Sequence, residues 1–472
     1  MRFIKIIIIT LLCNCNLAIC QKTKKLDSLF VELHKQKSFN GNVLIAENGK
    51  IIYKNSFGLA NEQTKEKLNE NSIFELASVS KQFTAMAIVI LKEKGKINYK
   101  DKITTFLPEL SNYKNISIKN LLNHTSGLPD YMILLDSLLI EKKKWKHKTK
   151  IATNKSIIEI FAKHKPKVNF EPNEKWEYSN TGYALLASII EKASGKSYSE
   201  FLKTEIFIPL KMENTLVYRR RFEQKKIKNY AFGYVSDSLK NNVLPDEVKI
   251  DNLDKYVYTM DGIVGDGTVN STIIDLLKWD RALYSNEIIS EKSKNEVFNE
   301  AILNDKTKTD YGFGWELKSN GIFGRITNHG GGWPGYRTYI ERHLTNDKTI
   351  IMLQNNDNEN IYYPTKQIRE ILYNIAPTKI INLKNTEKQI FAGSYQTDKN
   401  DLRNLEIEND KLLIVFDPND KMELKPISKT KFIVEGFSPD VFYEFIFENG
   451  KVIKYIMTQP ELNNTKEAYK IK

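Results

Sequence analysis

The hydrophobic pattern of the sequence changes period near Pro377, and this change limits the chain to a fold with at least two units. Before that proline, stretches such as 363–375 place apolar residues at helical spacing. After a polar segment, apolar and polar residues alternate in short runs such as 411–416, separated by turn signals. The 472 residues are enough for two domains. We predict a mixed helical and sheet domain over 21–378, a linker over 379–385 and a small antiparallel β-domain over 386–472.

Strand patterns at both ends of the first domain enclose a helical middle. Residues 43–47 and 50–56 flank Asn48-Gly49, a dipeptide typical of a tight hairpin turn. Residues 335–342 and 349–355 carry further strand patterns. We therefore expect one central antiparallel sheet assembled from both ends of the domain, with helices on its faces.

A serine and a lysine three residues apart, Ser78 and Lys81, lie just before an apolar stretch that predicts a helix. One helical turn separates them, so their side chains should emerge on the same face. A helix N-terminus also offers free N–H groups that can stabilise an oxyanion. The pair is thus a candidate nucleophile beside a proton carrier, although the same spacing recurs elsewhere in this lysine-rich chain.

Two further motifs give this pair a context. Tyr178-Ser179-Asn180 precedes a second apolar helix pattern, and His329-Gly330-Gly331-Gly332 follows a predicted strand. In this order along the chain, Ser-x-x-Lys, Tyr-x-Asn and His-x-Gly resemble the three motifs of the serine β-lactamase and penicillin-binding protein superfamily, in its class C and esterase-like branch. Connecting segments over roughly residues 25 to 375 are similar as well.

The resemblance implies a fold and a set of roles. It implies a β-lactamase/transpeptidase-like domain with an α/β part and an all-α part, followed by a lipocalin-like barrel. Ser78 would attack a carbonyl carbon, and Lys81 and Tyr178 would share the movement of its proton. Asn180 would position the substrate amide, and the N–H groups of Ser78 and Gly332 would form the oxyanion hole. Because an unperturbed lysine is protonated at pH 7, the identity of the general base stays open.

His329 departs from the pattern of the penicillin-processing members, which usually have lysine at this position. Histidine titrates near pH 6.5, so at neutral pH we expect only a weak, conditional positive charge for a substrate carboxylate beside Gly331. This charge argues against an efficient β-lactamase. Members of the family with histidine at this position include D-amino-acid peptidases and esterases, so the resemblance favours one of these.

The sequence thus predicts a serine hydrolase that forms an acyl-enzyme at Ser78 on a peptide amide, an ester or a β-lactam. One alternative is an acylating sensor that recognises penicillin with little turnover, and another is a β-domain that carries a small apolar ligand. The expected partner is a small-molecule or peptide substrate such as a cell-wall fragment, and not nucleic acid. The histidines are scattered and every cysteine lies within residues 1–20, so we expect no metal and no cofactor.

The N-terminal segment predicts export. Residues 1–20 combine a basic start with a short apolar run, which is typical of a secretory signal peptide, and we expect a secreted or periplasmic protein beginning at Gln21. The segment also resembles a lipobox, in which Cys20 would carry a lipid and attach the protein to a membrane. Its removal lowers the formal charge from +13 to +11, because it holds two basic residues and no acidic ones. We expect the densest basic run, 142–148, to be a solvated loop.

Overall fold

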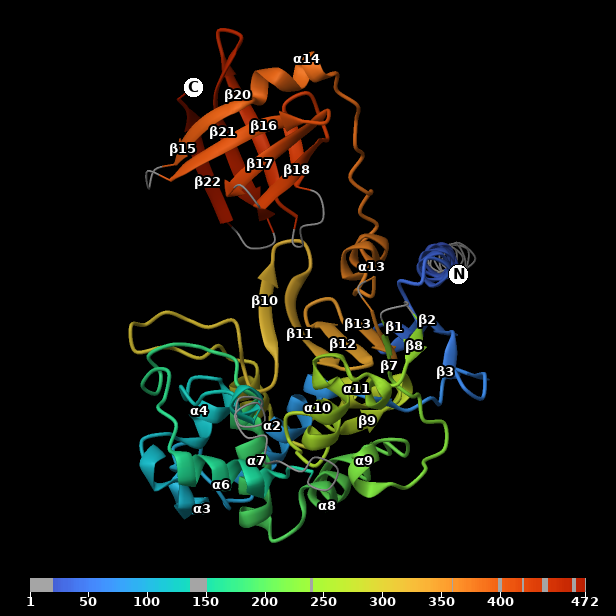
Figure 1. Ribbon diagram of the computed structural model, residues 1–472, viewed down its shortest axis with the longest axis vertical. Coiled ribbons are helices and arrows are strands. Elements are labelled where there is room, and N and C mark those ends of the chain that lie inside the picture. The colour runs from blue at the N-terminus through green and yellow to red at the C-terminus, as the bar shows by residue number, and fades with distance from the viewer. Residues whose placement is uncertain are drawn as a thin grey trace, which may run out of the picture. The chain divides into compact units, whose positions relative to one another are not determined.

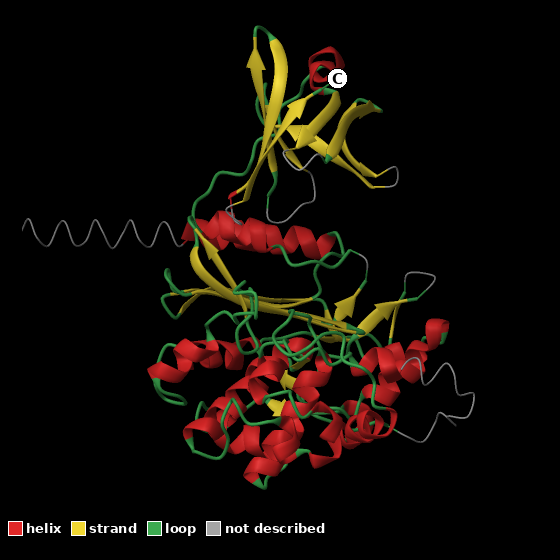
Figure 2. Cartoon of the chain, turned by 90° about the vertical axis from the view of Figure 1, so that its left-hand side faces the viewer, coloured by secondary structure: helices red, strands yellow, loops and turns green. Residues whose placement is uncertain are grey.

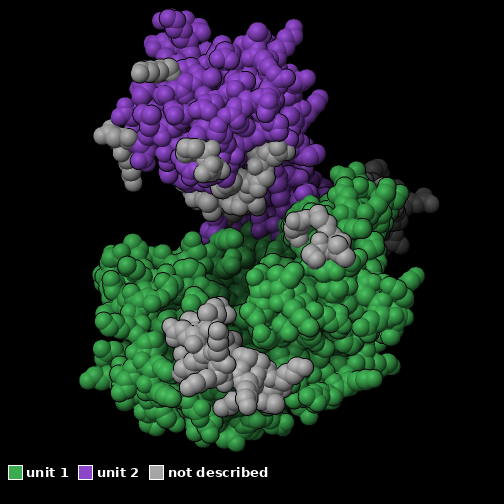
Figure 3. Space-filling model, viewed as in Figure 1, with its two compact units in different colours: residues 1–318, 326–363 green, residues 319–325, 364–472 purple. Residues whose placement is uncertain are grey.

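The computed structural model describes residues 20–135, 151–237, 241–358, 360–397, 401–417, 420–434, 440–460 and 464–471. The predicted signal peptide, apart from Cys20, and the basic run lie outside these ranges. The chain divides into two compact units, one of residues 1–318 and 326–363 and one of residues 319–325 and 364–472 (Figure 3). This division places the segment from 364 to 378 with the second unit, whereas the sequence pattern places it with the first domain.

A six-stranded sheet with the order β10-β11-β12-β13-β1-β2 forms the centre of the first unit (Figure 1). Its strands are β1 (Gly41–Glu47), β2 (Lys50–Phe57), β10 (Glu316–Asn320), β11 (Gly324–Trp333), β12 (Tyr336–His343) and β13 (Lys348–Gln354). β1 pairs antiparallel with both β2 and β13, and Leu44 lies opposite Ile351. The prediction of one antiparallel sheet built from both ends of the domain is therefore confirmed.

Helices cover both faces of this sheet, as Figure 2 shows with the strands nearly edge-on. Residues 20–35 are helical and lie on one face. From this segment, the fully buried ring of Phe30 stacks on Tyr53 and Phe57 of β2, with ring centroids 5.8 and 6.2 Å apart. The opposite face carries the larger helical half, which contains both helices predicted beside the motifs.

The remaining elements of the first unit are helices, turns and short strands. The helices are α2 (Lys81–Glu93), α3 (Ile103–Phe106), α4 (Ile118–Leu122), α6 (Asn154–His164), α7 (Asn180–Ser194), α8 (Tyr198–Leu202), α9 (Arg220–Glu223), α10 (Leu253–Met260), α11 (Ile273–Ala282) and α12 (Glu291–Val297), with single turns at η1 (Ala77–Ser80), η2 (Pro108–Tyr113), η3 (Lys203–Phe207), η4 (Pro245–Glu247) and η5 (Ile250–Asn252). The small strands are β3 (Leu59–Asn61), β4 (Glu66–Lys67), β5 (Phe74–Glu75), β6 (Leu216–Val217), β7 (Tyr234–Ser236), β8 (Asn242–Val243), β9 (Val269–Ser271) and β14 (Asn356–Asp357). Among the described residues, no helix is both long and apolar enough to span a bilayer.

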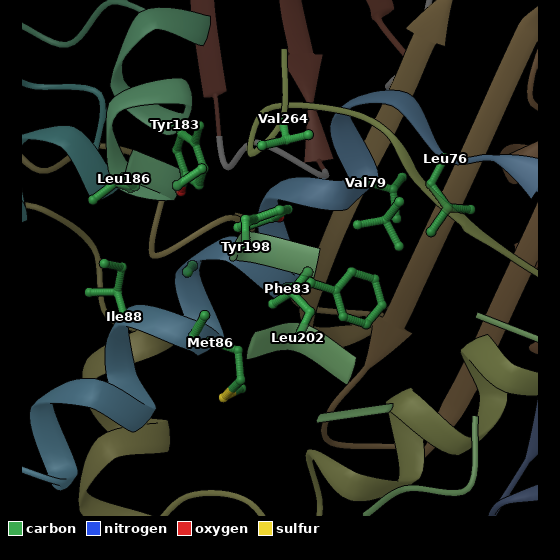
Figure 4. Packing of buried hydrophobic residues seen from close by; sticks show 14 of the residues in the cluster. Leu76, Val79, Phe83, Met86, Ile88, Tyr183, Leu186, Tyr198, Leu202 and Val264 are labelled. Carbon is green, nitrogen blue, oxygen red and sulfur yellow. The ribbon is translucent and has the colours of Figure 1, made fainter. Parts of the chain in front are cut away.

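Helix α2 is the centre of the hydrophobic core. Every residue from Lys81 to Leu91 is buried, so the helix has apolar neighbours on all sides. Figure 4 shows Phe83 and Met86 of α2 in the same cluster as Tyr183 and Leu186 of α7. This packing fixes the first turn of α2, and with it the Ser-x-x-Lys motif, against the start of α7.

The second unit contains a closed eight-stranded barrel, so the predicted C-terminal β-barrel is confirmed. Its strands are β15 (Gly393–Thr397), β16 (Leu402–Glu408), β17 (Lys411–Asp417), β18 (Asp420–Pro426), β19 (Lys431–Val434), β20 (Phe442–Glu448), β21 (Lys451–Gln459) and β22 (Asn464–Lys470), and α13 (Thr365–Leu372), α14 (Asn385–Lys388) and η6 (Gln389–Phe391) precede them. Aromatic rings pack together as a core of this unit, with Tyr395 and Tyr455 5.0 Å apart and Phe432 and Phe445 5.4 Å apart.

The fold predicts a large cost for truncating Phe83. Its ring is fully buried, 4.6 Å from the ring of Trp279, so Phe83→Ala should lower the free energy of unfolding by about 3–5 kcal/mol. All five tryptophans lie within the sequence of the first unit, so tryptophan fluorescence during urea denaturation reports on this unit. Ile208→Ala, at a residue 60% exposed, is the control and should change the free energy by less than about 0.5 kcal/mol. Equal effects of the two variants would contradict this account of the core.

Candidate active site

The structure brings Ser78 and Lys81 into direct contact at the start of α2. Ser78 belongs to the single turn η1, and Lys81 is the first residue of the helix. The Lys81 side chain is fully buried, and its Nζ lies 3.1 Å from the Ser78 Oγ. Ala77, just before the serine, has a φ of +48°, which is uncommon for a residue other than glycine. Such strain beside a candidate nucleophile is typical of functional sites.

Two further oxygen atoms hold the Lys81 amine in place. Its Nζ donates to the Asn180 Oδ1 at 2.8 Å and to the backbone oxygen of Asp266 at 3.0 Å. Both are acceptors only, so they use two of the lysine N–H groups. The third position on Nζ faces the Ser78 Oγ. A protonated Lys81 donates a hydrogen bond there, and a neutral Lys81 offers its lone pair to the serine proton.

Asp130 sets the orientation of the Asn180 amide. Its Oδ2 accepts hydrogen bonds from the Asn180 Nδ2 at 3.0 Å and from the Asn180 backbone N–H at 2.8 Å. Because the amide NH₂ points to this carboxylate, its oxygen must face Lys81. Sequence reasoning missed Asp130, which lies in a loop and belongs to none of the three motifs.

Tyr131 and Asp266 form a buried pair on the other side of the lysine. The Tyr131 hydroxyl donates to the Asp266 Oδ2 at 2.8 Å, and both side chains are buried. Burial raises the pKa of the Asp266 carboxyl above its usual value, and the nearby Lys81 opposes this rise. Neither residue was singled out from the sequence as a site residue.

Tyr178 contributes its ring to the lysine environment. The Lys81 Nζ lies 4.9 Å from the centre of that ring, in the range of a cation–π contact. Among the described residues, the Tyr178 hydroxyl forms no hydrogen bond with Ser78 or Lys81. Its ring packs at 4.3 Å on His124, whose Nδ1 accepts the backbone N–H of Ser179 at 3.2 Å. His124 therefore contacts both the Tyr178 ring and the Ser179 backbone and helps to hold the segment 178–180 in place.

His329 is held as a neutral side chain, and this corrects the expectation of a conditional positive charge at neutral pH. The Nδ1 lies 2.6 Å from the backbone oxygen of Gly330, which can only accept, so Nδ1 carries the proton. The Nε2 then accepts from the Tyr311 hydroxyl at 2.9 Å. Burial, with a smaller contribution from Lys81, lowers the pKa of His329 to about 4. The sequence motif gave no sign of this burial.

The glycine-rich end of β11 lies against the residues just before Ser78. A Cβ on Gly331 would stand only 2.3 Å from the Leu76 oxygen and 2.3 Å from the Thr338 Oγ1, so only glycine fits there. The Thr338 hydroxyl also donates to the Leu76 oxygen at 2.6 Å. This contact brings the next residue, Gly332, to the pocket that Ser78 lines. Its backbone is therefore close to the candidate nucleophile.

A small pocket of about 90 Å³ opens on the candidate nucleophile. Its lining residues come from β5, η1, the helical segment 131–135, the first residue of α7, α10, the loop before β9, and β11, and they are Glu75, Ala77, Ser78, Tyr131, Met132, Asn180, Met260, Asp261, Ile263, Asp266, Gly267, Thr268, Gly332 and Trp333. Within the described ranges, no group of three or more His, Cys, Asp or Glu side chains is placed to hold a metal ion.

The buried state of His329 predicts a pH effect on stability. Its pKa is near 6.5 in the unfolded chain and about 4 in the folded protein, so between these values the unfolded state binds more protons. Stability that is present above pH 6.5 is therefore lost as the pH falls toward 4. The free energy of unfolding of the parent, minus that of His329→Gln, should fall by roughly 3 kcal/mol between pH 8 and pH 4. Urea denaturation across this range checks the prediction, and a constant difference would contradict it.

The contacts of Asp130 predict a positioning role. Asp130→Ala removes the group that orients the Asn180 amide, so kcat/KM for an ester or amide substrate should fall by about 100-fold. The variant should keep the circular dichroism spectrum of the parent. Adding Asn180→Ala to the Asp130→Ala variant should lower kcat/KM only slightly further, because the two residues act as a unit. Full additivity of the two losses would contradict the role assigned to Asp130.

Comparisons with known proteins identify the family of the chain. The sequence profile of the β-lactamase family matches residues 26–372. Penicillin-binding protein 4* of Bacillus subtilis is 42% identical over 433 residues, which cover 89% of this chain and 93% of that protein. Teichoic acid D-alanine hydrolase of Staphylococcus aureus is 27% identical over 65% of this chain and 70% of its own length.

Solved structures show the same fold. The octameric penicillin-binding protein homologue of Pyrococcus abyssi superposes with a TM-score of 0.63 at 22% identity, over 94% of this chain and 99% of that one. D-amino acid amidase of Ochrobactrum anthropi superposes with a TM-score of 0.59 at 25% identity, over 77% of this chain and 100% of that one. With the family profile over most of the chain and a relative at 42% identity, this protein belongs to the β-lactamase family of serine hydrolases.

Proposed function

We propose that the protein hydrolyses a small amino-acid amide or ester through an acyl-enzyme on Ser78. The observation that carries this proposal is the 3.1 Å contact between the Ser78 Oγ and the buried Lys81 Nζ at the edge of a pocket. A serine hydroxyl needs an adjacent base to become an effective nucleophile, and a buried amine in direct contact can take its proton.

The proposed reaction has two steps. The Ser78 Oγ bonds to the substrate carbonyl carbon while its proton passes to Lys81 or to Tyr178. The oxyanion is stabilised by the N–H groups of Ser78 and Gly332, and the bond to the leaving nitrogen or oxygen then breaks as that atom takes up the proton. A water molecule adds to the ester carbon in the second step and releases the acid and free Ser78. Asn180 both positions the substrate and holds Lys81.

We infer that the substrate is a D-amino-acid peptide or ester of the cell envelope. The neutral His329 supports this choice, because it provides no cation for the carboxylate that a penicillin carries. The relatives named for teichoic acid D-alanine and for D-amino acid amides support it as well. The family resemblance and the predicted signal peptide, residues 1–20, support a location outside the cytoplasm, either secreted or attached through Cys20.

Ser78→Ala tests the catalytic proposal. The variant should lose at least about 1000-fold in kcat/KM for p-nitrophenyl acetate and for D-alanine p-nitroanilide, because no other group replaces the nucleophile. Parental rates in this variant would refute the proposal. Pre-steady-state kinetics separate the hydrolase from the acylating sensor: steady release of p-nitrophenol supports the hydrolase, and a burst without turnover supports the sensor.

A further inference from the structure

A second carboxyl group, on Glu75, faces the pocket without a partner. Glu75 belongs to the short strand β5, three residues before the nucleophile, and pairs with Asn270 of β9. Its side chain is only 7% exposed, and it lines the same small pocket as Ser78. Among the described residues, its carboxyl accepts no hydrogen bond and forms no ion pair. A buried carboxyl without a partner is costly, so it calls for an explanation.

The two arginines that act electrostatically on Glu75, Arg220 and Arg221, already form ion pairs with aspartates. Arg220 and Arg221 both pair with Asp246, and Arg221 also donates to the Asp261 Oδ1 at 3.1 Å. Asp261 accepts further hydrogen bonds from the backbone N–H groups of Arg221 and Phe222. These two arginines and two aspartates balance one another, which leaves the Glu75 carboxyl as an extra acid at the pocket wall.

The electrostatic state of Glu75 suits the capture of a cation. Burial raises the pKa of this carboxyl to about 8, and the Asp261 carboxylate adds to the rise while Arg221 and Arg220 oppose it. A positive charge that enters the pocket favours the ionised form, so the carboxylate forms together with its partner.

The rest of the pocket wall points to the same kind of ligand. The lining carries the carboxyl groups of Glu75, Asp261 and Asp266, and the described lining residues include no lysine and no arginine. His329 is neutral, so it adds no positive charge. The volume of about 90 Å³ is small, which favours a compact acyl group. Beside Glu75, a substrate ammonium would therefore be favoured over a substrate carboxylate.

From the unpartnered Glu75 carboxyl in the nucleophile's pocket, we propose that this residue binds the free α-ammonium group of a small aminoacyl substrate such as an alanyl amide or ester. This inference rests on the proposed function, since the bound acyl group is the one that Ser78 accepts. It makes Glu75 the residue that selects substrates with a free amino terminus over N-blocked ones.

A pair of substrates that differ only in this charge tests the proposal. D-alanine p-nitroanilide carries the ammonium, and N-acetyl-D-alanine p-nitroanilide does not. The parent should prefer the charged substrate in kcat/KM by roughly 10- to 100-fold, mainly through a lower KM, as expected for a hydrogen bond between charged groups. Equal rates on the two substrates, or no hydrolysis of either, would overturn the inference.

Glu75→Gln then assigns the preference to this carboxyl. The substitution keeps the size of the side chain and removes its charge, so the ratio of kcat/KM between the two substrates should fall to about 1. Glu75→Asp keeps the charge at a shorter reach and should give an intermediate ratio. Glu66→Gln, at an exposed residue of β4, is the matched control and should keep the parental ratio. A purely structural Glu75 would lower both rates alike and leave the ratio unchanged, which would overturn the inference.

The same measurements separate the two proposals. If Ser78→Ala keeps its activity, the proposed function fails. If hydrolysis depends on Ser78 while Glu75→Gln keeps the parental preference, only the assignment of Glu75 fails.

Discussion

The burial of the Lys81 amine is the constraint on which the rest of the site depends. A lysine side chain withdrawn from water is unfavourable unless its polar head finds partners. Here three oxygen atoms surround it, from Ser78, Asn180 and Asp266. These residues belong to η1, to the start of α7 and to the loop before β9, so one amine ties together segments that are far apart in the sequence. The packing of α2 against α7 keeps this arrangement rigid.

The sequence predicted those parts of the structure that depend on local periodicity and on the motifs. The strand patterns around Asn48-Gly49 and after Gly335 predicted the central sheet. The change of period after Pro377 predicted a second, antiparallel β-domain, and the family resemblance identified it as a barrel. The helix spacing predicted that the Ser78 and Lys81 side chains would meet. These features need only neighbouring residues to be recognised.

The parts that the sequence could not predict depend on contacts between distant residues. Asp130 lies 50 residues from Asn180, and Tyr131 lies 135 residues from Asp266, so no local pattern connects either pair. The sequence also did not show which polar side chains are buried. From the sequence we expected an ordinary pKa for His329, whereas in the structure its burial and its contacts with Gly330 and Tyr311 keep it neutral. Burial likewise distinguishes Glu75 from the many exposed acids of the chain.

The electrostatics of the pocket agree with the substrate class that we propose. A neutral His329 offers no cation to a substrate carboxylate, and the unpartnered Glu75 favours a substrate cation. Within one family, the sign of the charge beside the nucleophile can therefore select between substrates while the serine and lysine stay the same.

The most direct test of the account is the mass of the active-site peptide after reaction with a serine-directed reagent. The folded protein is incubated with a fluorophosphonate, quenched in acid, digested and analysed by mass spectrometry. The account predicts one covalent adduct, located on Ser78 and absent from the Ser78→Ala variant. A folded protein without an adduct, or with the adduct on another side chain, would contradict it.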